Sequence, residues 1–133
     1  MNASRHAASG RGDGPVRTVN GCSCVMLAGF ALVQYNDPDA ILWFLIYAIP
    51  AIWAGLTAFR PERLAPRAPM IGAYLACLAA AITGSLWCWP ALPAGWIHIE
   101  TERESLGIII ATLVLALAGL SWRRRLWQPA HRP

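Results

Sequence analysis

Two short stretches of this chain carry most of the side chains that could do chemistry. The first reads Gln34-Tyr35-Asn36-Asp37-Pro38-Asp39 and is followed by Trp43 and Tyr47. On a helix, residues four apart share one face, so Asp39, Trp43 and Tyr47 would form a stripe of a carboxylate, an indole and a phenol. Such a stripe is suited to walling a small-molecule pocket or to contributing a cation ligand.

The second stretch contains Glu100, Arg103 and Glu104 and is followed by Gly107. Carboxylate oxygens are the ligands that calcium and magnesium prefer, whereas the nearby His98 would favour a transition metal. A single histidine beside tryptophans is more often an interface residue, so we assign no metal ligands and leave any cofactor unknown. A purely structural role, in which Arg103 pairs with the carboxylates, is the simpler explanation because polar pairs near helix ends are common.

Catalysis has little support in the sequence. The chain has no serine or cysteine with a partnered histidine, no His-Glu-x-x-His pair and no phosphate-binding loop. Nothing places a nucleophile beside the carboxylates, so we expect no enzyme and no catalytic residue. The candidate ligand-binding or structural cluster is Gln34, Asn36, Asp37, Asp39, Trp43, Tyr47, Glu100, Arg103 and Glu104.

The composition indicates that these residues lie on membrane helices. Of the 133 residues, 56% are hydrophobic and only 14% are charged, against about 25% in a typical soluble domain. A bilayer-spanning helix needs about 20 apolar residues, and the chain has four such runs. We therefore predict an all-α, four-transmembrane-helix bundle with helices at about 19–35, 38–59, 70–87 and 102–122, a disordered cytoplasmic tail at 1–18 and a basic cytoplasmic tail at 123–133.

The helix ends have simple cap interpretations. Asp37 is the expected N-cap of the second helix, with Pro38 at the first helical position. Thr101 and Glu104 fit a capping box at the start of the fourth helix.

Small residues recur every four positions along the third predicted helix, at Gly72, Ala76, Ala80 and Gly84. In lipid, such a face lets helix backbones approach closely. We expect this helix to be the packing centre of the bundle, or to dock a second copy or a membrane-protein partner.

Arginine distribution predicts the orientation, because short cytoplasmic loops are enriched in positive charge. Ten of the eleven arginines fall on one side, and only Arg103 falls on the other. We expect a multi-pass protein of the inner (plasma) membrane with both termini in the cytoplasm, no nucleic-acid partner, and the acidic turns facing outward. If the second and fourth helices are neighbours, Arg103 would reach Asp37 or Asp39.

The two stretches together resemble the signatures of the transmembrane protein 220 family. The matching residues are Gln34-x-Asn36-Asp37-Pro38-Asp39 with Trp43 and Tyr47, and Glu100-x-x-Arg103-Glu104-x-x-Gly107. The resemblance covers about residues 20–122 and implies a small membrane protein of four helices. Ala40 departs from the family pattern, in which proline is common. The resemblance implies fold and topology but no particular activity.

The sequence thus predicts a small integral membrane protein whose polar cluster is structural or binds a ligand. The alternative is an accessory subunit of a membrane complex, or an oligomeric transporter of a small solute or metal ion. The apolar runs carry no arginine or carboxylate near their centres, where carriers usually place one.

Overall fold

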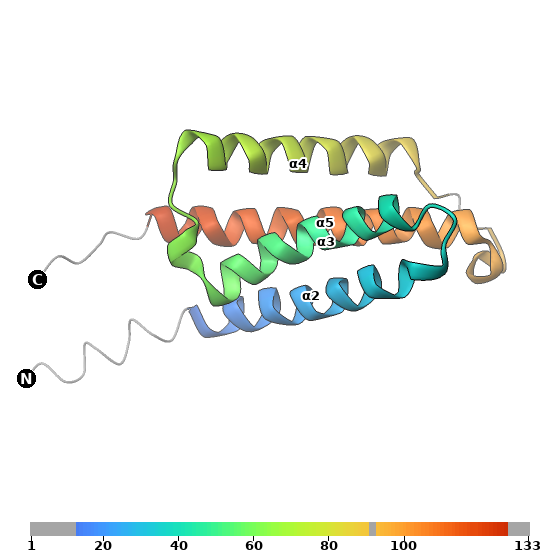
Figure 1. Ribbon diagram of the computed structural model, residues 1–133, viewed down its shortest axis with the longest axis horizontal. Coiled ribbons are helices and arrows are strands. Elements are labelled where there is room, and N and C mark those ends of the chain that lie inside the picture. The colour runs from blue at the N-terminus through green and yellow to red at the C-terminus, as the bar shows by residue number, and fades with distance from the viewer. Residues whose placement is uncertain (1–12, 91–92, 128–133) are drawn as a thin grey trace, which may run out of the picture.

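The computed structural model describes residues 13–90 and 93–127 (Figure 1). Within these residues it contains helices and no strands, which confirms the expected all-helical class. The long helices are α2 (Asp13–Val33), α3 (Ala40–Phe59), α4 (Ala68–Trp87) and α5 (Glu100–Trp127). Short 3-10 turns lie between them at Gln34–Asn36, Pro61–Arg63 and Trp96–His98.

Each of the four long helices is long and apolar enough to cross a membrane. At 1.5 Å per residue, the 20 residues of α3 or α4 span about 30 Å, which is the thickness of the hydrocarbon core. Large apolar side chains point outward along the bundle, such as Leu32 (70% exposed) and Ile41 (80% exposed). Such exposure suits a surface that faces lipid rather than water.

The helix bounds differ from the expected ones mainly at the start of the first long helix and at the end of the last one. α2 begins at Asp13, so residues 13–18 are helical and not part of a disordered tail. α5 continues to Trp127, past the expected end at residue 122. The remaining residues of the two predicted tails, 1–12 and 128–133, lie outside the described part of the chain.

The helices are arranged around α5. Figure 1 shows α2 and α4 on opposite sides of the pair formed by α3 and α5. α5 packs against α2, α3 and α4 and is the most buried of the four, while α4 packs mainly against α5 and is the least buried. The expectation that the third helix forms the packing centre is therefore wrong, and Gly72, Ala76 and Ala80 are exposed on it.

An aromatic ring seated on a glycine joins α4 to α5. The phenol of Tyr74 lies so close to Gly119 that a β-carbon there would overlap both its Oη and its Cζ atoms. The Tyr74 hydroxyl donates a hydrogen bond to the Leu115 carbonyl oxygen at 3.0 Å. Trp53 of α3 and Trp122 of α5 complete the cluster, with ring centroids 5.2 Å and 5.8 Å from that of Tyr74.

Small residues also bring α2 close to α3. A β-carbon at Gly55 would lie 2.9 Å from the Cys24 sulfur, and one at Gly21 would lie 3.2 Å from the ring of Phe59. α2 reaches α5 through the buried Asn20 side chain, whose Nδ2 donates to Ser121 Oγ at 3.0 Å. Buried hydrogen bonds of this kind help associate helices in lipid.

Gly119→Ala is predicted to loosen α4 from α5. The added methyl group meets the rigid ring of Tyr74, and overpacking of this kind typically costs about 1–3 kcal/mol. Urea or thermal unfolding of the purified protein in detergent measures the loss.

Gly72→Ala is the matched control, because nothing lies within 4 Å of a β-carbon at that position of α4. Alanine is the better helix former, so this variant should be as stable as the wild type or slightly more stable. Equal stability of the two variants would contradict the contact between Tyr74 and Gly119.

Candidate functional site

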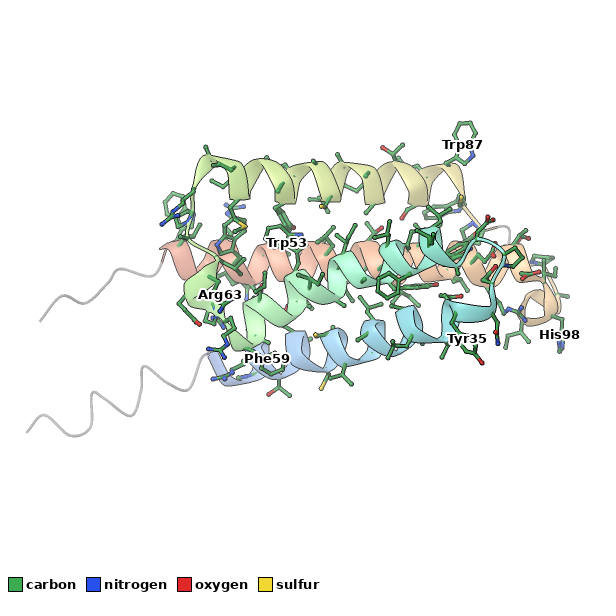
Figure 2. All side chains as sticks on the ribbon, in the orientation of Figure 1. Tyr35, Trp53, Phe59, Arg63, Trp87 and His98 are labelled. Atoms are coloured by element: carbon green, nitrogen blue, oxygen red, sulfur yellow. The ribbon has the colours of Figure 1, made fainter. Side chains whose placement is uncertain are left out.

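The carboxylates of the two polar stretches meet at one end of the bundle. The turn between α2 and α3 and the start of α5 lie at the same end in Figure 2, where Tyr35 and His98 are labelled. We call this the acidic end and define it by Asp37, Asp39, Glu100, Glu102 and Glu104. The half-buried Glu104 is close enough to Glu100, Asp37 and Asp39 for their charges to act on it.

Arg103 does not form the expected ion pair with Asp37 or Asp39. Its guanidinium donates to the Ile97 carbonyl oxygen at 3.1 Å, and its charge acts on Glu104 without a close contact. Within residues 13–90 and 93–127, the only ion pair shown joins Arg60 and Glu62, at 3.8 Å, at the opposite end of the bundle. The arginine binds its own connecting segment because Arg103 lies one turn into α5, directly after that segment.

The predicted side-chain caps are also absent. α3 begins at Ala40, so its N-cap is Asp39, which makes no side-chain cap bond. Asp37 contributes its main-chain carbonyl, which accepts a bond from the Ala40 amide at 3.1 Å. The acidic residues of this turn therefore have no capping role that explains them.

At the start of α5, the helix begins at Glu100, one residue before Thr101, so the capping box predicted there is wrong. The Thr101 carbonyl accepts a bond from Ser105 Oγ at 2.7 Å inside the helix. Glu100 and Glu102 instead place negative charge in the first turn, where it interacts favourably with the helix dipole.

The aromatic part of the first stretch belongs to the core. Trp43 and Tyr47 are buried, and their rings stack with centroids 6.2 Å apart. Phe30 of α2 meets Tyr47 edge to face at 5.7 Å. The predicted stripe therefore divides, with Asp39 exposed at the end of the bundle and the two rings inside it.

Tyr47 lies directly on Gly107, which connects the first stretch to the second. A β-carbon at Gly107 would overlap Tyr47 Oη and would lie 3.1 Å from its Cζ. The glycine is therefore required by close packing between α3 and α5. We call this contact the Tyr47–Gly107 contact.

The remaining candidates lie on the surface. Gln34 is half-buried, and its carbonyl accepts the Asp37 amide at 3.0 Å, while the Asn36 and His98 side chains are exposed. Among the residues that the structure describes, no three His, Cys, Asp or Glu side chains are placed to hold a metal ion together.

Two contacts of Tyr47 were not predicted from the sequence. One is the edge-to-face contact with Phe30, and the other is the packing of the Tyr47 ring on Gly107. Both residues stand in apolar runs where phenylalanine and glycine are ordinary. The only signal was the placement of Tyr47 and Gly107 one turn further into the membrane than Trp43 and Glu104.

Comparison with known proteins gives matches over the membrane helices. The family model described as "Transmembrane family 220, helix" matches residues 26–120, which include both polar stretches. Transmembrane protein 220 of Xenopus laevis is 31% identical over 97 residues, covering 67% of this chain and 52% of that protein. The chain thus spans about half the length of this curated relative. No solved structure matches the chain.

Gly107→Ala is predicted to destabilise the bundle by about 1–3 kcal/mol, because its methyl group would overlap the phenol oxygen of Tyr47. Tyr47→Phe removes that oxygen, so the double variant Gly107→Ala/Tyr47→Phe should recover part of the loss. Unfolding of the four proteins in one detergent gives the coupling energy.

Gly119→Ala with Tyr74→Phe is the control for this cycle. At Gly119 the β-carbon would still overlap the Cζ atom of the ring after the oxygen is removed, so little recovery is expected. Strict additivity of Gly107→Ala and Tyr47→Phe would show that the two residues are not in contact.

Proposed function

This chain belongs to the transmembrane protein 220 family, and from the geometry of its acidic end we propose that it is a non-enzymatic membrane protein that binds a cation there. The ligand would be an inorganic cation or a positively charged organic group from the aqueous phase. The observation that carries the proposal is that the charges of Glu100, Asp37 and Asp39 all act on the half-buried Glu104, while Arg103 alone opposes them.

Gathering like charges lowers the stability of a fold. Glu100 and Glu104 are four residues apart on α5, and a like-charge pair at that spacing costs about 0.2–0.5 kcal/mol. Asp37 and Asp39 add to the repulsion from the neighbouring turn. A cation that binds the folded state would offset this cost.

The absence of a three-residue ligand set in the described chain favours attraction by charge over direct coordination. A calcium site surrounds the ion with six to eight oxygen ligands. The acidic end instead presents a negative surface that would concentrate cations of different shapes.

We propose that the acidic end faces outward from the plasma membrane. The opposite end carries Arg60, Arg63, Arg67, Arg123, Arg124 and Arg125, and the start of α2 and the end of α5 lie there (Figure 1). Positive residues favour the cytoplasmic side and attract anionic headgroups. Exposed Trp87 and Trp89 at the acidic end and Trp127 at the other suit the two interfaces.

Labelling with a membrane-impermeant maleimide tests this orientation in a variant in which the four native cysteines are replaced by alanine. Asn36→Cys should react in intact cells, whereas Arg63→Cys should react only after permeabilisation. Both positions are exposed, so burial does not distinguish them, and the reverse pattern would overturn the orientation.

Glu104→Gln tests the cation proposal. The substitution removes one charge from the cluster, so it should raise the free energy of unfolding in cation-free buffer by about 0.5–1 kcal/mol, from several like-charge contacts of a few tenths each. Calcium or spermidine, added at constant ionic strength, should raise the melting temperature of the wild type more than that of the variant.

Glu62→Gln is the matched control, since Glu62 is an exposed glutamate at the opposite end that touches only Arg60 among the ion pairs shown. This substitution should change the free energy of unfolding by no more than a few tenths of a kcal/mol. It should leave the response to cations unchanged. A wild type that is indifferent to both cations would contradict the proposal.

An accessory role in a larger membrane complex, or as one chain of an oligomeric transporter, is the second candidate. The observation that favours it is the exposed small-residue face of α4, at Gly72, Ala76 and Ala80. The native mass of the protein extracted in a mild detergent distinguishes a single chain from an assembly.

A further inference from the structure

Two tyrosines of the bundle make the same contact with α5, but their hydroxyl groups differ. Tyr74 packs directly on Gly119, and Tyr47 packs directly on Gly107. The Tyr74 hydroxyl donates a hydrogen bond to the Leu115 carbonyl oxygen at 3.0 Å. Within residues 13–90 and 93–127, the structure shows no hydrogen bond for the Tyr47 hydroxyl. One of two equivalent hydroxyl groups is thus satisfied, and the other has no partner in the described chain.

The unpartnered hydroxyl belongs to a buried side chain, since Tyr47 is only 6% exposed. In folded proteins nearly all buried polar groups have a hydrogen-bond partner, because an unpaired one costs free energy. A phenylalanine at this position would supply the same ring to the core without the unpaired group. The hydroxyl therefore points to a partner from outside the chain.

The Tyr47 hydroxyl lies next to the carboxylates of the acidic end. Long side chains on a helix point back toward its N-terminus, and α3 begins at the acidic end. The phenol oxygen meets α5 at Gly107, three residues after Glu104 and hence on the same helix face. The charge of Glu104 acts on Tyr47. The phenol oxygen and this carboxylate can therefore contact the same ligand.

These groups favour a ligand that has several N–H donors. Ionised carboxylates only accept hydrogen bonds, and a phenol oxygen can accept one as well. A primary ammonium group carries a positive charge and three N–H donors. It can therefore donate to Glu104 and to Tyr47 Oη at the same time, and such charge-assisted hydrogen bonds are roughly twice as strong as neutral ones.

A metal ion fits this arrangement less well. Calcium needs six to eight oxygen ligands, and in the described part of the chain no three His, Cys, Asp or Glu side chains are placed to hold an ion together. A metal ion that keeps its shell of water is too wide to reach the oxygen of a side chain as buried as Tyr47. An alkylammonium ion instead ends in a single narrow group.

We propose that the acidic end binds the primary ammonium group of an organic amine, which donates hydrogen bonds to the Glu104 carboxylate and to the Tyr47 hydroxyl oxygen. This inference rests on the proposed cation-binding function and names the chemical class of its ligand. The other carboxylates that act on Glu104 are Asp37, Asp39 and Glu100. They would attract a second ammonium group on the same molecule, so a diamine or polyamine suits the acidic end best.

Putrescine and its bis(trimethylammonium) analogue test the proposal as a matched pair of ligands. Both carry the same charge on the same spacer, but only putrescine has N–H donors. The melting temperature of the protein in detergent, measured against ligand concentration at constant ionic strength, gives the two dissociation constants. The wild type should bind putrescine about tenfold more tightly, because the analogue cannot make hydrogen bonds that involve a charged group.

Tyr47→Phe and Tyr74→Phe form the matched pair of variants, since each removes one phenol oxygen from a ring that packs on a glycine. Tyr47→Phe should lose the preference for putrescine and keep the melting temperature of the ligand-free wild type. Tyr74→Phe should keep the preference and melt at a lower temperature, because it loses the hydrogen bond to Leu115.

The possible failures separate this inference from the proposed function. Equal affinity of the wild type for the two ligands would overturn the ammonium proposal and leave cation binding by charge intact. A preference for putrescine that survives in Tyr47→Phe, or that is lost equally in Tyr74→Phe, would overturn it as well. A wild type that binds neither ligand would overturn both the inference and the proposed function.

Discussion

The bundle depends on aromatic rings that lie directly on glycines of α5. Inside a bilayer the surrounding lipid is as apolar as the side chains, so helices associate through close packing rather than through expulsion from water. The ring of Tyr47 in α3 packs directly on Gly107, and the ring of Tyr74 in α4 packs directly on Gly119. Each contact fixes the distance and the rotation of one helix relative to α5, because a rigid ring fits the space left by a missing side chain in few ways. The central position of α5 follows from its carrying both glycines.

The same contact determines the geometry of the acidic end. Asp39 precedes Tyr47 by two helical turns on α3, and Glu104 precedes Gly107 by nearly one turn on α5. Packing the ring on the glycine therefore places both carboxylates on the same side of this contact, toward the acidic end. Trp43, which lies between Asp39 and Tyr47 in the sequence, stacks on Tyr47. The two polar stretches that carry the family resemblance thus form a single unit, in which buried aromatic residues lie beneath the carboxylates of Asp37, Asp39, Glu100 and Glu104.

Much of the architecture follows from the sequence because long apolar runs and arginine-rich loops have few interpretations. The four spans and the convergence of the two acidic stretches needed no knowledge of packing. The cap at Asp37 and the box at Thr101 were wrong for a common reason. Each depends on where a helix begins to within one residue, and α3 and α5 begin two residues away from the expected positions. The packing of Tyr47 on Gly107 could not be predicted, because it depends on the relative rotation of two helices that are distant in the sequence.

The small residues of α4 show why a pattern can be recognised and still be assigned to the wrong contact. Gly72, Ala76, Ala80 and Gly84 do lie on one face, yet of the two glycines only Gly84 comes near a neighbouring helix, with a β-carbon there 3.6 Å from Ile108. Ala76 and Ala80 are exposed. The contacts of α4 with α5 are made by an adjacent face that includes Tyr74, Cys77 and Ser85. Small side chains therefore have two uses in a membrane helix: they let another backbone approach, or they leave room beside the helix. In α4, Gly72, Ala76 and Ala80 stay exposed, so most of the small face leaves room beside the helix instead of closing a contact.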